Sequence, residues 1–300
     1  MAASAWDEVE ALARRHVSGV SIRPSEQSVH IQNVDEPDDS DKRRFQIGLA
    51  GIDRGLKPLL PGGFTVIGAR QGHGKTSLAE VIALANSQNY MVTFATLEMT
   101  AEDLRERVVA RMLNMSLDDA DWHRNAKTNS YQRAISALSD LRLHLWHPTR
   151  GAKKDVAAIV AVAEQDDADM LIIDYTRKID GWIPGSGGPF QITSDLSGYS
   201  KQSRRHVVLL SQLNRDAQGK RPIPSQLQDT GLLEQEAEKC LLLYRPFSGM
   251  GAEDTICEII VAKNRRGPEF RGHVGWSGSR TEFLSMSLDE ERLAVQRCCG

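Results

Sequence analysis

Residues 64–78, FTVIGARQGHGKTSL, decide the fold of this chain. A short apolar run, 64–67, predicts a buried strand that leads into a glycine-rich turn ending in Gly74-Lys75-Thr76. Apolar residues then recur at helical spacing, at Leu78, Val81, Ile82 and Ala85. In such a strand, turn and helix, backbone N–H groups of the turn point inward and the helix N-terminus adds the positive end of its dipole. A polyphosphate can therefore bind at this turn.

The turn predicts a site for ATP and Mg²⁺. Lys75 is expected to reach the terminal phosphates, and the Thr76 hydroxyl is expected to coordinate Mg²⁺. The strict pattern has glycine six residues before the lysine, where this chain has Ala69. An ordinary glycine-rich surface turn is the alternative interpretation, and the adjoining strand and helix argue against it. The nucleotide-binding residues that we predict are Ala69, Arg70, Gln71, Gly72, His73, Gly74, Lys75, Thr76 and Ser77.

The composition is typical of a soluble globular protein, with 40% hydrophobic and 26% charged residues. No apolar run approaches the roughly 18 residues of a membrane span, and the acidic N-terminal stretch lacks the apolar core of a secretion signal. We therefore expect a cytoplasmic protein. Its four cysteines lack zinc-type spacing, which predicts reduced thiols. A net charge of −3 excludes a global basic field, so nucleic acid would have to bind local patches, or a groove or channel that assembly creates.

Three segments of the chain differ in their patterns. Residues 1–44 contain one amphipathic helix, from Trp6 to Val17, and a polar, acidic stretch that predicts a linker. Residues 45–285 carry the strand and helix patterns of a catalytic domain, and residues 286–300 are predicted to be a C-terminal tail. The N-terminal helix has two interpretations: it covers its own domain, or it docks on a neighbouring subunit.

After the glycine-rich turn, strands alternate with helices. Thr100 and Asp103 predict a capping box at the start of one of these helices. Continuous apolar runs are typical of parallel strands that are buried on both faces. The predicted strands are 91–97, 141–145 and 169–174, with three more beginning at His206, Cys240 and Glu258. This order indicates a doubly wound α/β fold, whose ligands bind at the carboxyl ends of the strands.

Polar side chains end several of these strands. Asp174 is placed to hold Mg²⁺ through water, although aspartate also simply terminates strands. Glu98 is placed to polarise a water for attack on the γ-phosphate; its alternative role is that of a solvated acid before the next helix. Gln212 is expected to contact the γ-phosphate through its amide and so to sense which nucleotide is bound.

Lys263 and Arg265 follow another strand and lie too far along the sheet to be assigned to the same nucleotide. One interpretation is that they are solvated cations. The other is that they face the nucleotide of an adjacent subunit, where an arginine finger raises the rate by about 10³-fold or more in other NTPases. Hydrolysis would then depend on assembly.

Six blocks of sequence occur in a fixed order: GARQGHGKT, TLEM, LIIDY, LLSQLNR, KRPIPSQLQDTGLLEQEAE and AKNRRGP. In this order they resemble the C-terminal, RecA-like motor domain of DnaB-type replicative helicases, over about residues 45–283. That family also has alanine at the position of Ala69, and its members look like hexameric rings that thread one DNA strand. The resemblance implies nucleotide binding by Lys75 and Thr76, Mg²⁺ at Asp174, Glu98 as catalytic base, Gln212 as phosphate sensor, and Lys263 and Arg265 acting in trans.

In this family two central loops grip the DNA phosphates. The first candidate is 177–200, whose glycines and prolines predict a flexible loop, and the second is 221–234. The family's usual arginine in the second loop is replaced by Gln228, which predicts a weaker or displaced DNA grip. Phosphate contacts predict little sequence preference and a marked salt dependence. The residues that we predict at DNA are Lys178, Lys220, Arg221, Gln228, Asp229 and Gly231, with ordinary surface loops as the alternative.

DnaB-type proteins also carry an N-terminal collar domain that helps to close the ring and recruits primase. The 44 residues before the match are too few for this domain, so we expect assembly through the helix from Trp6 to Val17. The predicted partners are single-stranded and forked DNA, further copies of the chain, and replication proteins, with no membrane.

Three functions fit these motifs. The first is an ATP-dependent helicase that translocates on single-stranded DNA and unwinds duplex in replication. The second is a DNA-stimulated RecA-like ATPase of recombination or repair that does not unwind processively, which the missing collar and Gln228 favour. The third, a nuclease acting on branched DNA, is disfavoured because the sequence contains no recognisable nuclease metal cluster. Displacement of an intact DNA strand would distinguish the first function from the others.

Overall fold

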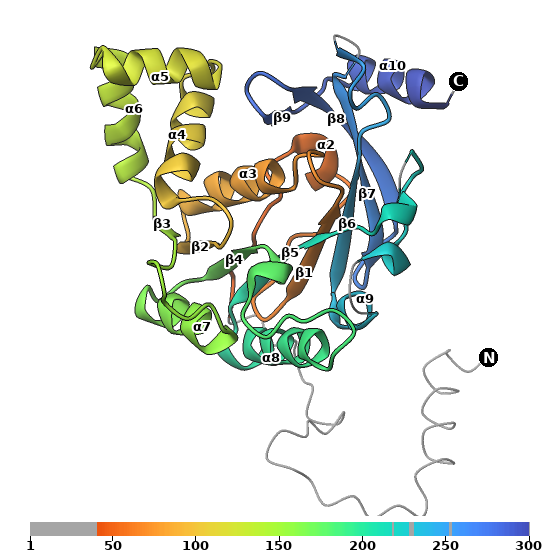
Figure 1. The fold of residues 1–300 in the computed structure, drawn as a ribbon. Coiled ribbons are helices and arrows are strands. Elements are labelled where there is room, and N and C mark those ends of the chain that lie inside the picture. Colours follow the sequence, from red (N-terminus) through yellow and green to blue (C-terminus); the bar gives the residue numbers. More distant parts are fainter. Residues whose placement is uncertain (1–40, 218, 228–230, 252–253, 300) are drawn as a thin grey trace, which may run out of the picture. The chain divides into compact units, whose positions relative to one another are not determined.

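Nine strands of the described residues form one sheet, in the order β3-β2-β4-β5-β1-β6-β7-β8-β9 (Figure 1). The computed structural model describes residues 41–217, 219–227, 231–251 and 254–299, and Arg43–Gly300 form one unit. The strands are β1 (Phe64–Ala69), β2 (Val92–Thr96), β3 (Leu143–Trp146), β4 (Met170–Asp174), β5 (His206–Gln212), β6 (Lys239–Tyr244), β7 (Ile256–Asn264), β8 (Phe270–Ser277) and β9 (Glu282–Leu284).

The six strands from β3 to β6 in this order run parallel, as predicted for the apolar runs of β4, β5 and β6. Ala69 at the end of β1 lies beside Gln212 at the end of β5. Thr96 at the end of β2 lies beside Asp174 at the end of β4. The carboxyl ends of these four strands therefore meet at one edge of the sheet, where a doubly wound fold binds its ligands.

The last three strands are antiparallel. The expectation that the strand at Glu258 continues the parallel run is wrong, because this residue lies in β7, which pairs antiparallel with β6. The connection from Tyr244 to Ile256 is shorter than the dozen or more residues that a parallel crossover needs. Sequence analysis did not predict β8 and β9. Gly272 and Gly275 interrupt the apolar pattern of β8, and β9 is short.

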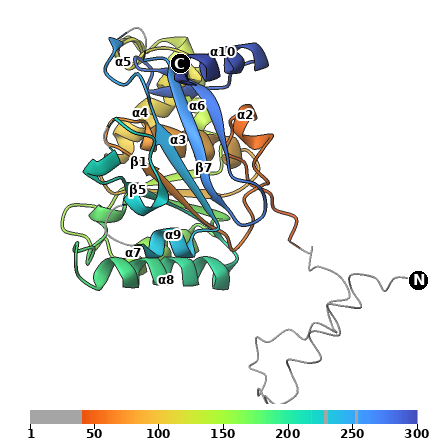
Figure 2. The ribbon, with the colours of Figure 1, turned by 90° about the vertical axis from the view of Figure 1, so that its right-hand side faces the viewer.

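Helices cover both faces of the sheet. Along β1, Phe64 and Val66 belong to the core on the side of α7 and α8, whereas Ile67 and Ala69 belong to the core on the side of α3. Figures 1 and 2 show α7, α8 and α9 on one face and α2 and α3 on the other. The helices are α2 (Ala50–Asp53), α3 (Lys75–Ser87), α4 (Ala101–Met112), α5 (Leu117–Asn125), α6 (Asn129–Ser139), α7 (Val156–Gln165), α8 (Gly188–Ser203), α9 (Leu232–Glu236) and α10 (Leu288–Cys299), with short 3₁₀ turns η2 (Thr176–Lys178), η3 (Arg215–Ala217) and η4 (Pro224–Gln226). The doubly wound α/β prediction is confirmed.

Helices α4, α5 and α6 form a group beyond the β3 edge of the sheet (Figure 1). The predicted capping box is present at the start of α4, where Thr100 Oγ1 accepts from the Asp103 N–H and the Asp103 carboxylate accepts from the Thr100 N–H. Val109 of α4 packs with Tyr131 and Ala134 of α6 in a small core of their own. The group is therefore anchored to the sheet through α4, which follows β2 directly.

The segment 177–200 is not a continuous flexible loop, and that expectation is wrong. Its first residues lie in η2, and from Gly188 onward the chain forms helix α8. Pro189 stands in the first turn of α8, where proline is tolerated because no intrahelical N–H bond is needed. Ile192 and Leu196 then recur at helical spacing and are buried in the core. Residues 179–187 alone connect η2 to α8.

Two further expectations concern the ends of the chain. The helix from Trp6 to Val17 and the acidic linker after it lie outside the described residues. At the other end, α10 packs beside β8. In the portion of the chain that the structure describes, no helix is both long enough and apolar enough to cross a membrane. Cys240 and Cys257 are buried thiols that form no disulfide among the described residues.

His206, at the start of β5, is buried among polar partners that fix its tautomer. Its Nδ1 lies 2.7 Å from the Leu60 carbonyl oxygen, and its Nε2 lies 3.0 Å from the Thr65 Oγ1. Because a carbonyl oxygen only accepts, Nδ1 carries the proton and Nε2 accepts from the Thr65 hydroxyl. Burial lowers the pKa of His206 to about 4.

Acidification is therefore expected to destabilise the fold through His206. Since the ordinary pKa is about 6.5, the unfolded chain takes up this proton first, and stability falls as the pH drops from about 6.5 to 4. The shift amounts to about 3 kcal/mol of unfolding free energy. Denaturant unfolding of the wild type and of His206→Gln at several pH values measures the effect. Parallel stability curves for the two proteins would contradict it.

Candidate functional site

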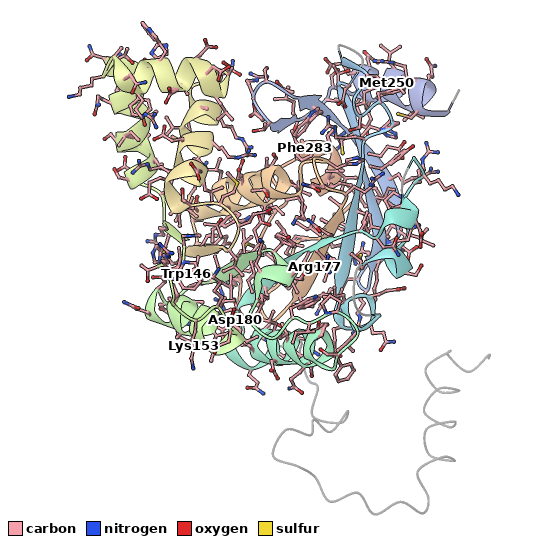
Figure 3. All side chains as sticks on the ribbon, viewed as in Figure 1. Trp146, Lys153, Arg177, Asp180, Met250 and Phe283 are labelled. Atoms are coloured by element: carbon pink, nitrogen blue, oxygen red, sulfur yellow. The ribbon has the colours of Figure 1, made fainter. Side chains whose placement is uncertain are left out.

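The glycine-rich turn between β1 and α3 has the backbone geometry of an anion cradle. Gly72 and Gly74 have φ values of 78° and 89°, which residues with a Cβ adopt rarely. A Cβ at Gly74 would lie 2.6 Å from Cζ of Phe283, the β9 residue that is marked in Figure 3. Lys75 begins α3 directly after Gly74. The turn therefore approaches the β8–β9 hairpin more closely than any other residue type at position 74 would permit.

A lysine, a hydroxyl and a carboxylate meet at the start of α3. Lys75 Nζ lies 3.3 Å from Asp174 Oδ1, and Thr76 Oγ1 donates to Asp174 Oδ2 at 2.5 Å. The ammonium also stands 3.9 Å from the centroid of the Tyr175 ring. Burial lowers the pKa of Lys75, and the Asp174 carboxylate opposes this shift. The Thr76 and Asp174 oxygens are the hard donors that Mg²⁺ prefers, so the residues present fit a magnesium site.

Of these residues, Lys75 and Thr76 line a pocket of about 220 Å³. It is lined by Arg70, Gln71, Gly72, Gly74, Lys75, Thr76, Ser77, Glu98, Met99, Arg107, Gln212, Trp276 and Thr281. Seven of the nine predicted nucleotide-binding residues thus line one pocket, together with Glu98 and Gln212. Ala69 is buried in β1, and His73 is held beside Arg70 and Arg245, where burial and these cations lower its pKa to about 4.

The loop that carries Glu98 is tied to the end of the sheet. The Leu97 N–H donates to the Asp174 carbonyl oxygen at 2.7 Å, and Thr96 Oγ1 donates to the Met99 carbonyl oxygen at 2.8 Å. His147 Nδ1 lies 2.9 Å from the Thr96 carbonyl oxygen. Glu98 itself is exposed and faces the pocket, so its carboxylate can accept a proton from water there.

Glu98→Gln is expected to lower ATP turnover about 100-fold or more while ATP still binds, because the amide cannot accept the proton of the attacking water. Steady-state hydrolysis and retention of bound ATP measure the two effects. Glu102→Gln, an exposed glutamate in the first turn of α4, is the matched control. Full turnover by the Glu98 variant would assign the base to another residue.

Lys263 and Arg265 lie at the end of β7 and beyond it, and neither is among the described residues that line the pocket. Lys263 Nζ donates to the carbonyl oxygens of Glu234 and Gln235, and Arg265 Nη2 donates to the Gln235 carbonyl oxygen at 2.6 Å. Both cations therefore hold the end of α9 within their own subunit. Burial and the neighbouring Arg265 lower the pKa of Lys263.

The predicted DNA residues have different surroundings. Lys178 in η2 and Lys220 are exposed, and Gly231 precedes α9. Arg221 makes two hydrogen bonds to the buried Glu258 carboxylate, at 2.8 and 2.9 Å, and donates to the Cys298 carbonyl oxygen. Gln228 and Asp229 lie outside the described residues. Figure 3 marks Arg177, which is exposed just after β4.

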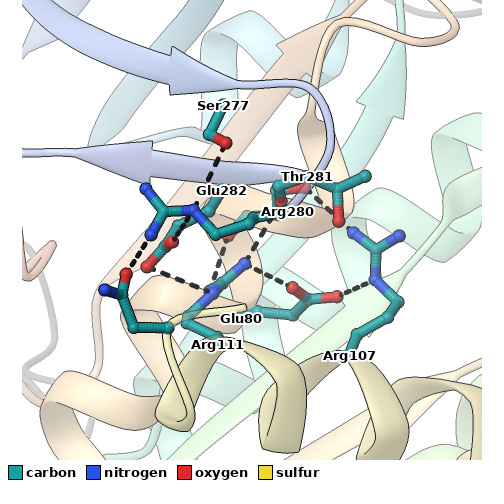
Figure 4. Close-up of polar contacts among 9 residues, drawn as sticks. Glu80, Arg107, Arg111, Ser277, Arg280, Thr281 and Glu282 are labelled. Carbon is teal, nitrogen blue, oxygen red and sulfur yellow. Dashed lines mark hydrogen bonds and ion pairs between the residues drawn. The ribbon is translucent and has the colours of Figure 1, made fainter. Parts of the chain in front are cut away.

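Sequence reasoning missed four residues that line the pocket: Met99, Arg107, Trp276 and Thr281. Trp276 and Thr281 come from the β8–β9 hairpin, which was not predicted. Arg107 lies on the predicted helix after Glu98, about two turns from the helix start. Its ion pair with Glu80 of α3 (Figure 4) is not signalled by any local spacing. The hairpin thus closes one side of a site that the strand ends alone do not complete.

Known proteins resemble this chain in sequence and in fold. A family model described as the DnaB-like helicase C-terminal domain matches residues 45–285. A probable plasmid replicative DNA helicase of Chlamydia trachomatis serovar L2 is 29% identical over 252 residues, covering 81% of this chain and 55% of the relative. The replicative DNA helicase DnaB of Haemophilus influenzae is 25% identical over 273 residues, covering 81% and 56%. The chain therefore spans about half the length of these curated relatives.

Solved structures give the same fold. A DnaB-like replicative helicase, whose structure was solved with its interactions with primase, has a TM-score of 0.75 at 22% identity, covering 94% of this chain and 72% of that one. A solved ATPase domain superposes with a TM-score of 0.74, also at 22% identity, covering 95% and 100%. The fold is thus that of a RecA-like ATPase domain. On the match over residues 45–285, this chain belongs to the family of DnaB-like helicase C-terminal domains.

Proposed function

We propose that this chain hydrolyses ATP with Mg²⁺ and uses the free energy to move along single-stranded DNA and to separate duplex DNA in replication. One observation carries the proposal: Lys75, Thr76 and Asp174 meet at the carboxyl ends of β1 and β4, beside the same pocket as Glu98 and Gln212. Membership of a helicase family supports it. DNA, further copies of the chain and replication proteins are the partners that we propose.

The chain's residues divide the chemistry among them. Thr76 and Asp174 would hold Mg²⁺, which would neutralise negative charge on the phosphates. Lys75, fixed by Asp174 and Tyr175, binds the terminal phosphates. Glu98 orients a water and takes its proton, and Gln212, at the end of β5, contacts the γ-phosphate. Hydrolysis removes the γ-phosphate contact of Gln212. The position of this side chain would therefore depend on whether ATP or ADP is bound.

Assembly completes the site in this proposal. Lys263 and Arg265 are not among the described residues that line their own subunit's pocket, and they would reach the nucleotide of the next subunit in a homo-oligomeric ring. An arginine placed there stabilises the charge of the transition state. Each cation would then exchange its contacts at the end of α9 for contacts with phosphate.

The DNA contacts that we propose are made to phosphates. Lys178 and Lys220 are exposed cations, and a groove that tracks the phosphate backbone needs such cations. Arg221 is instead paired with Glu258. Because of this pairing, Arg221 has a partner other than DNA phosphate, so one predicted DNA contact is lost. The loss favours the second candidate function, a DNA-stimulated ATPase of recombination or repair that does not unwind processively.

ATP hydrolysis in the presence of increasing single-stranded DNA tests the proposal. We expect a Mg²⁺-dependent rate that rises with DNA, with an affinity for DNA that falls steeply as salt increases. The double variant Lys178→Ala, Lys220→Ala removes two expected phosphate contacts. The slope of log affinity for DNA against log salt concentration should therefore become shallower by about two. A rate that is indifferent to DNA at every salt concentration would overturn the DNA part of the proposal, and no Mg²⁺-dependent hydrolysis would overturn the whole.

A further inference from the structure

A carboxylate and an imidazole lie side by side on the antiparallel strands β7 and β8. Glu258 and His273 are register partners on these strands, and their side chains are 1% and 7% exposed. His273 Nε2 lies 3.9 Å from Glu258 Oε1, which is too long for a hydrogen bond. The two groups therefore share one buried place without bonding each other directly.

The His273 ring has a buried nitrogen that lacks a partner. Within the part of the chain that the structure describes, no hydrogen-bond partner of Nε2 is found. Such an atom is costly in a folded protein, so it calls for an explanation, and a bound ion is one of the few available. Burial lowers the pKa of His273, which keeps the ring neutral near pH 7. Neutral imidazole is the form that binds metal ions.

Cys298, near the end of α10, brings a sulfur atom to the same place. One ligand atom from each of Glu258, His273 and Cys298 lies within 4.8 Å of the other two. With Zn–N and Zn–S distances of about 2.0 and 2.3 Å, the ligand atoms of a tetrahedral zinc site lie about 3.3–3.6 Å apart. The three side chains would therefore have to close by about 1 Å to hold one ion.

The ligand types favour Zn²⁺. Thiolate, imidazole and carboxylate are all zinc ligands, and water completes the tetrahedron where the protein supplies three. Mg²⁺ and Ca²⁺ prefer oxygen ligands, so the nucleotide's metal ion is not expected here. The ligands come from β7, β8 and α10, which packs beside β8 (Figure 1). No spacing of cysteines along the sequence could have indicated such a site.

Arg221 is the cation that pairs with this carboxylate in the structure. Its Nε and Nη2 donate to the two Glu258 oxygens at 2.8 and 2.9 Å. Its Nη2 also donates to the Cys298 carbonyl oxygen at 3.0 Å. Arg221 thus joins β7 to the end of α10, the same two segments that a metal ion would join. Its side chain is 38% exposed, so the guanidinium can move into water without crossing the core.

The charges allow one cation to replace the other. Glu258 and Arg221 together are neutral. Coordination needs the Cys298 thiolate, whose proton passes to solvent. Zn²⁺ is then neutralised by the Glu258 carboxylate and this thiolate, and Arg221 would be left as an excess positive charge beside the ion. Because a buried excess charge is costly, the arginine has to leave when the ion binds.

We propose that Glu258, His273 and Cys298 form a zinc site, and that Zn²⁺ and Arg221 are alternative cations at Glu258. Binding of Zn²⁺ would release Arg221, one of the cations that we predict at DNA, and would hold the end of α10 through Cys298 instead. The competing explanation is a permanent ion pair of Arg221 with Glu258, against which His273 and Cys298 only pack.

Titration of the full chain with Co²⁺, followed by Zn²⁺, tests the site. Co²⁺ takes the same tetrahedral ligands as Zn²⁺ and is coloured, and a thiolate ligand adds a charge-transfer band. With a non-thiol reductant and excess Mg²⁺ present, we expect one Co²⁺ per chain, showing this band, and its displacement by one equivalent of Zn²⁺. Absence of the band from the wild type in excess Co²⁺ would overturn the proposal.

Substitution of the ligands identifies the site. Cys298→Ser should abolish the charge-transfer band, and both it and His273→Ala should weaken zinc binding about 100-fold or more, since changes around a metal ligand alone cost about 10–100-fold. Cys299→Ser removes the neighbouring thiol and is the matched control, which should bind zinc as the wild type does. If His273→Ala does not fold, the two cysteine variants decide, and equal zinc binding by both would overturn the site.

Arg221→Ala tests the exchange of cations. It should tighten zinc binding about tenfold or more, because Glu258 is left without a competing cation. A permanent ion pair that only supports the fold predicts weaker or unchanged binding, and either result would overturn the exchange. Arg271→Ala removes an exposed arginine of β8 and should change the affinity far less. If Arg221→Ala does not fold, the NMR signal of the wild-type Arg221 Nε–H decides: it should shift when Zn²⁺ is added, and an unchanged signal would overturn the exchange.

This inference goes beyond the proposed function and does not rest on it, because zinc binding is measured without nucleotide or DNA. If the chain hydrolyses ATP but shows no thiolate-bound Co²⁺, the inference fails and the proposed function stands. If it binds one Zn²⁺ through Cys298 and His273 but hydrolyses no ATP, the inference stands and the proposed function fails.

Discussion

Lys75→Ala is expected to lower ATP hydrolysis by about 1,000-fold. The substitution removes a fixed ammonium group that stabilises the negative charge developing on the phosphates in the transition state. Lys75 is only 9% exposed and is oriented by Asp174 and the Tyr175 ring, so little reorganisation is needed to receive phosphate. Steady-state release of phosphate measures the effect. Lys201→Ala removes an exposed lysine of α8 and is the matched control.

The same substitution leaves Asp174 without its cation, so loss of structure has to be separated from loss of chemistry. Removal of one partner of a buried ion pair costs about 3–5 kcal/mol in unfolding free energy. Thr76 Oγ1 still donates to Asp174 and limits that cost. Thermal unfolding of the variant shows whether it is folded at the assay temperature. A folded Lys75→Ala that hydrolyses ATP at the wild-type rate would exclude this pocket as the catalytic site.

Arg265→Ala is expected to lower hydrolysis about 1,000-fold or more while nucleotide binding by the isolated subunit stays unchanged, because the guanidinium acts on the nucleotide of a neighbour. Hydrolysis and MgADP binding measured on the same preparation provide the two readouts. Arg266→Ala is the matched control, since Arg266 is the next residue and pairs with Glu238 in its own subunit. The Arg265 guanidinium, in contrast, donates to the Gln235 carbonyl oxygen, a partner that it can exchange for phosphate.

Mixing of two inactive variants tests the trans role directly. Lys75→Ala subunits keep an intact Arg265, and Arg265→Ala subunits keep an intact phosphate site. An interface is complete when it pairs the intact phosphate site of an Arg265→Ala subunit with the intact Arg265 of a Lys75→Ala subunit. A mixture should therefore recover a fraction of the wild-type rate. No recovery in a mixture shown to co-assemble would contradict the trans role. Wild-type turnover in a strictly monomeric preparation would contradict it equally.

The parts of this fold that the sequence predicted are those encoded locally. The glycine-rich turn and the start of α4 are decided by residues within a few positions of each other. Continuous apolar runs identify the buried strands, although they do not distinguish the parallel β6 from the antiparallel β7. Asp174, Glu98 and Gln212 were expected near one another because the carboxyl ends of parallel strands meet at one edge. The strand order thus brings residues that are far apart in the sequence to one edge of the sheet.

The parts that were missed depend on contacts between distant segments. Trp276 and Thr281 reach the pocket through a hairpin whose short strands and glycines carry no strong pattern. Segment 177–200 was misassigned because its glycines and prolines cluster before Pro189, whereas its helical apolar spacing begins only afterwards. Arg107, which lines the pocket, is held in place by Glu80, 27 positions earlier in the sequence. No local sequence rule relates the two residues.

Displacement of a labelled strand from a forked DNA duplex, with ATP and Mg²⁺, is the direct test of helicase action. We expect the wild-type protein to release the intact strand and to need ATP to do so, and we expect Lys75→Ala beside it to release none. Hydrolysis stimulated by single-stranded DNA with no displaced strand would contradict helicase action and favour the DNA-stimulated ATPase. Shortened labelled fragments would contradict both and indicate a nuclease.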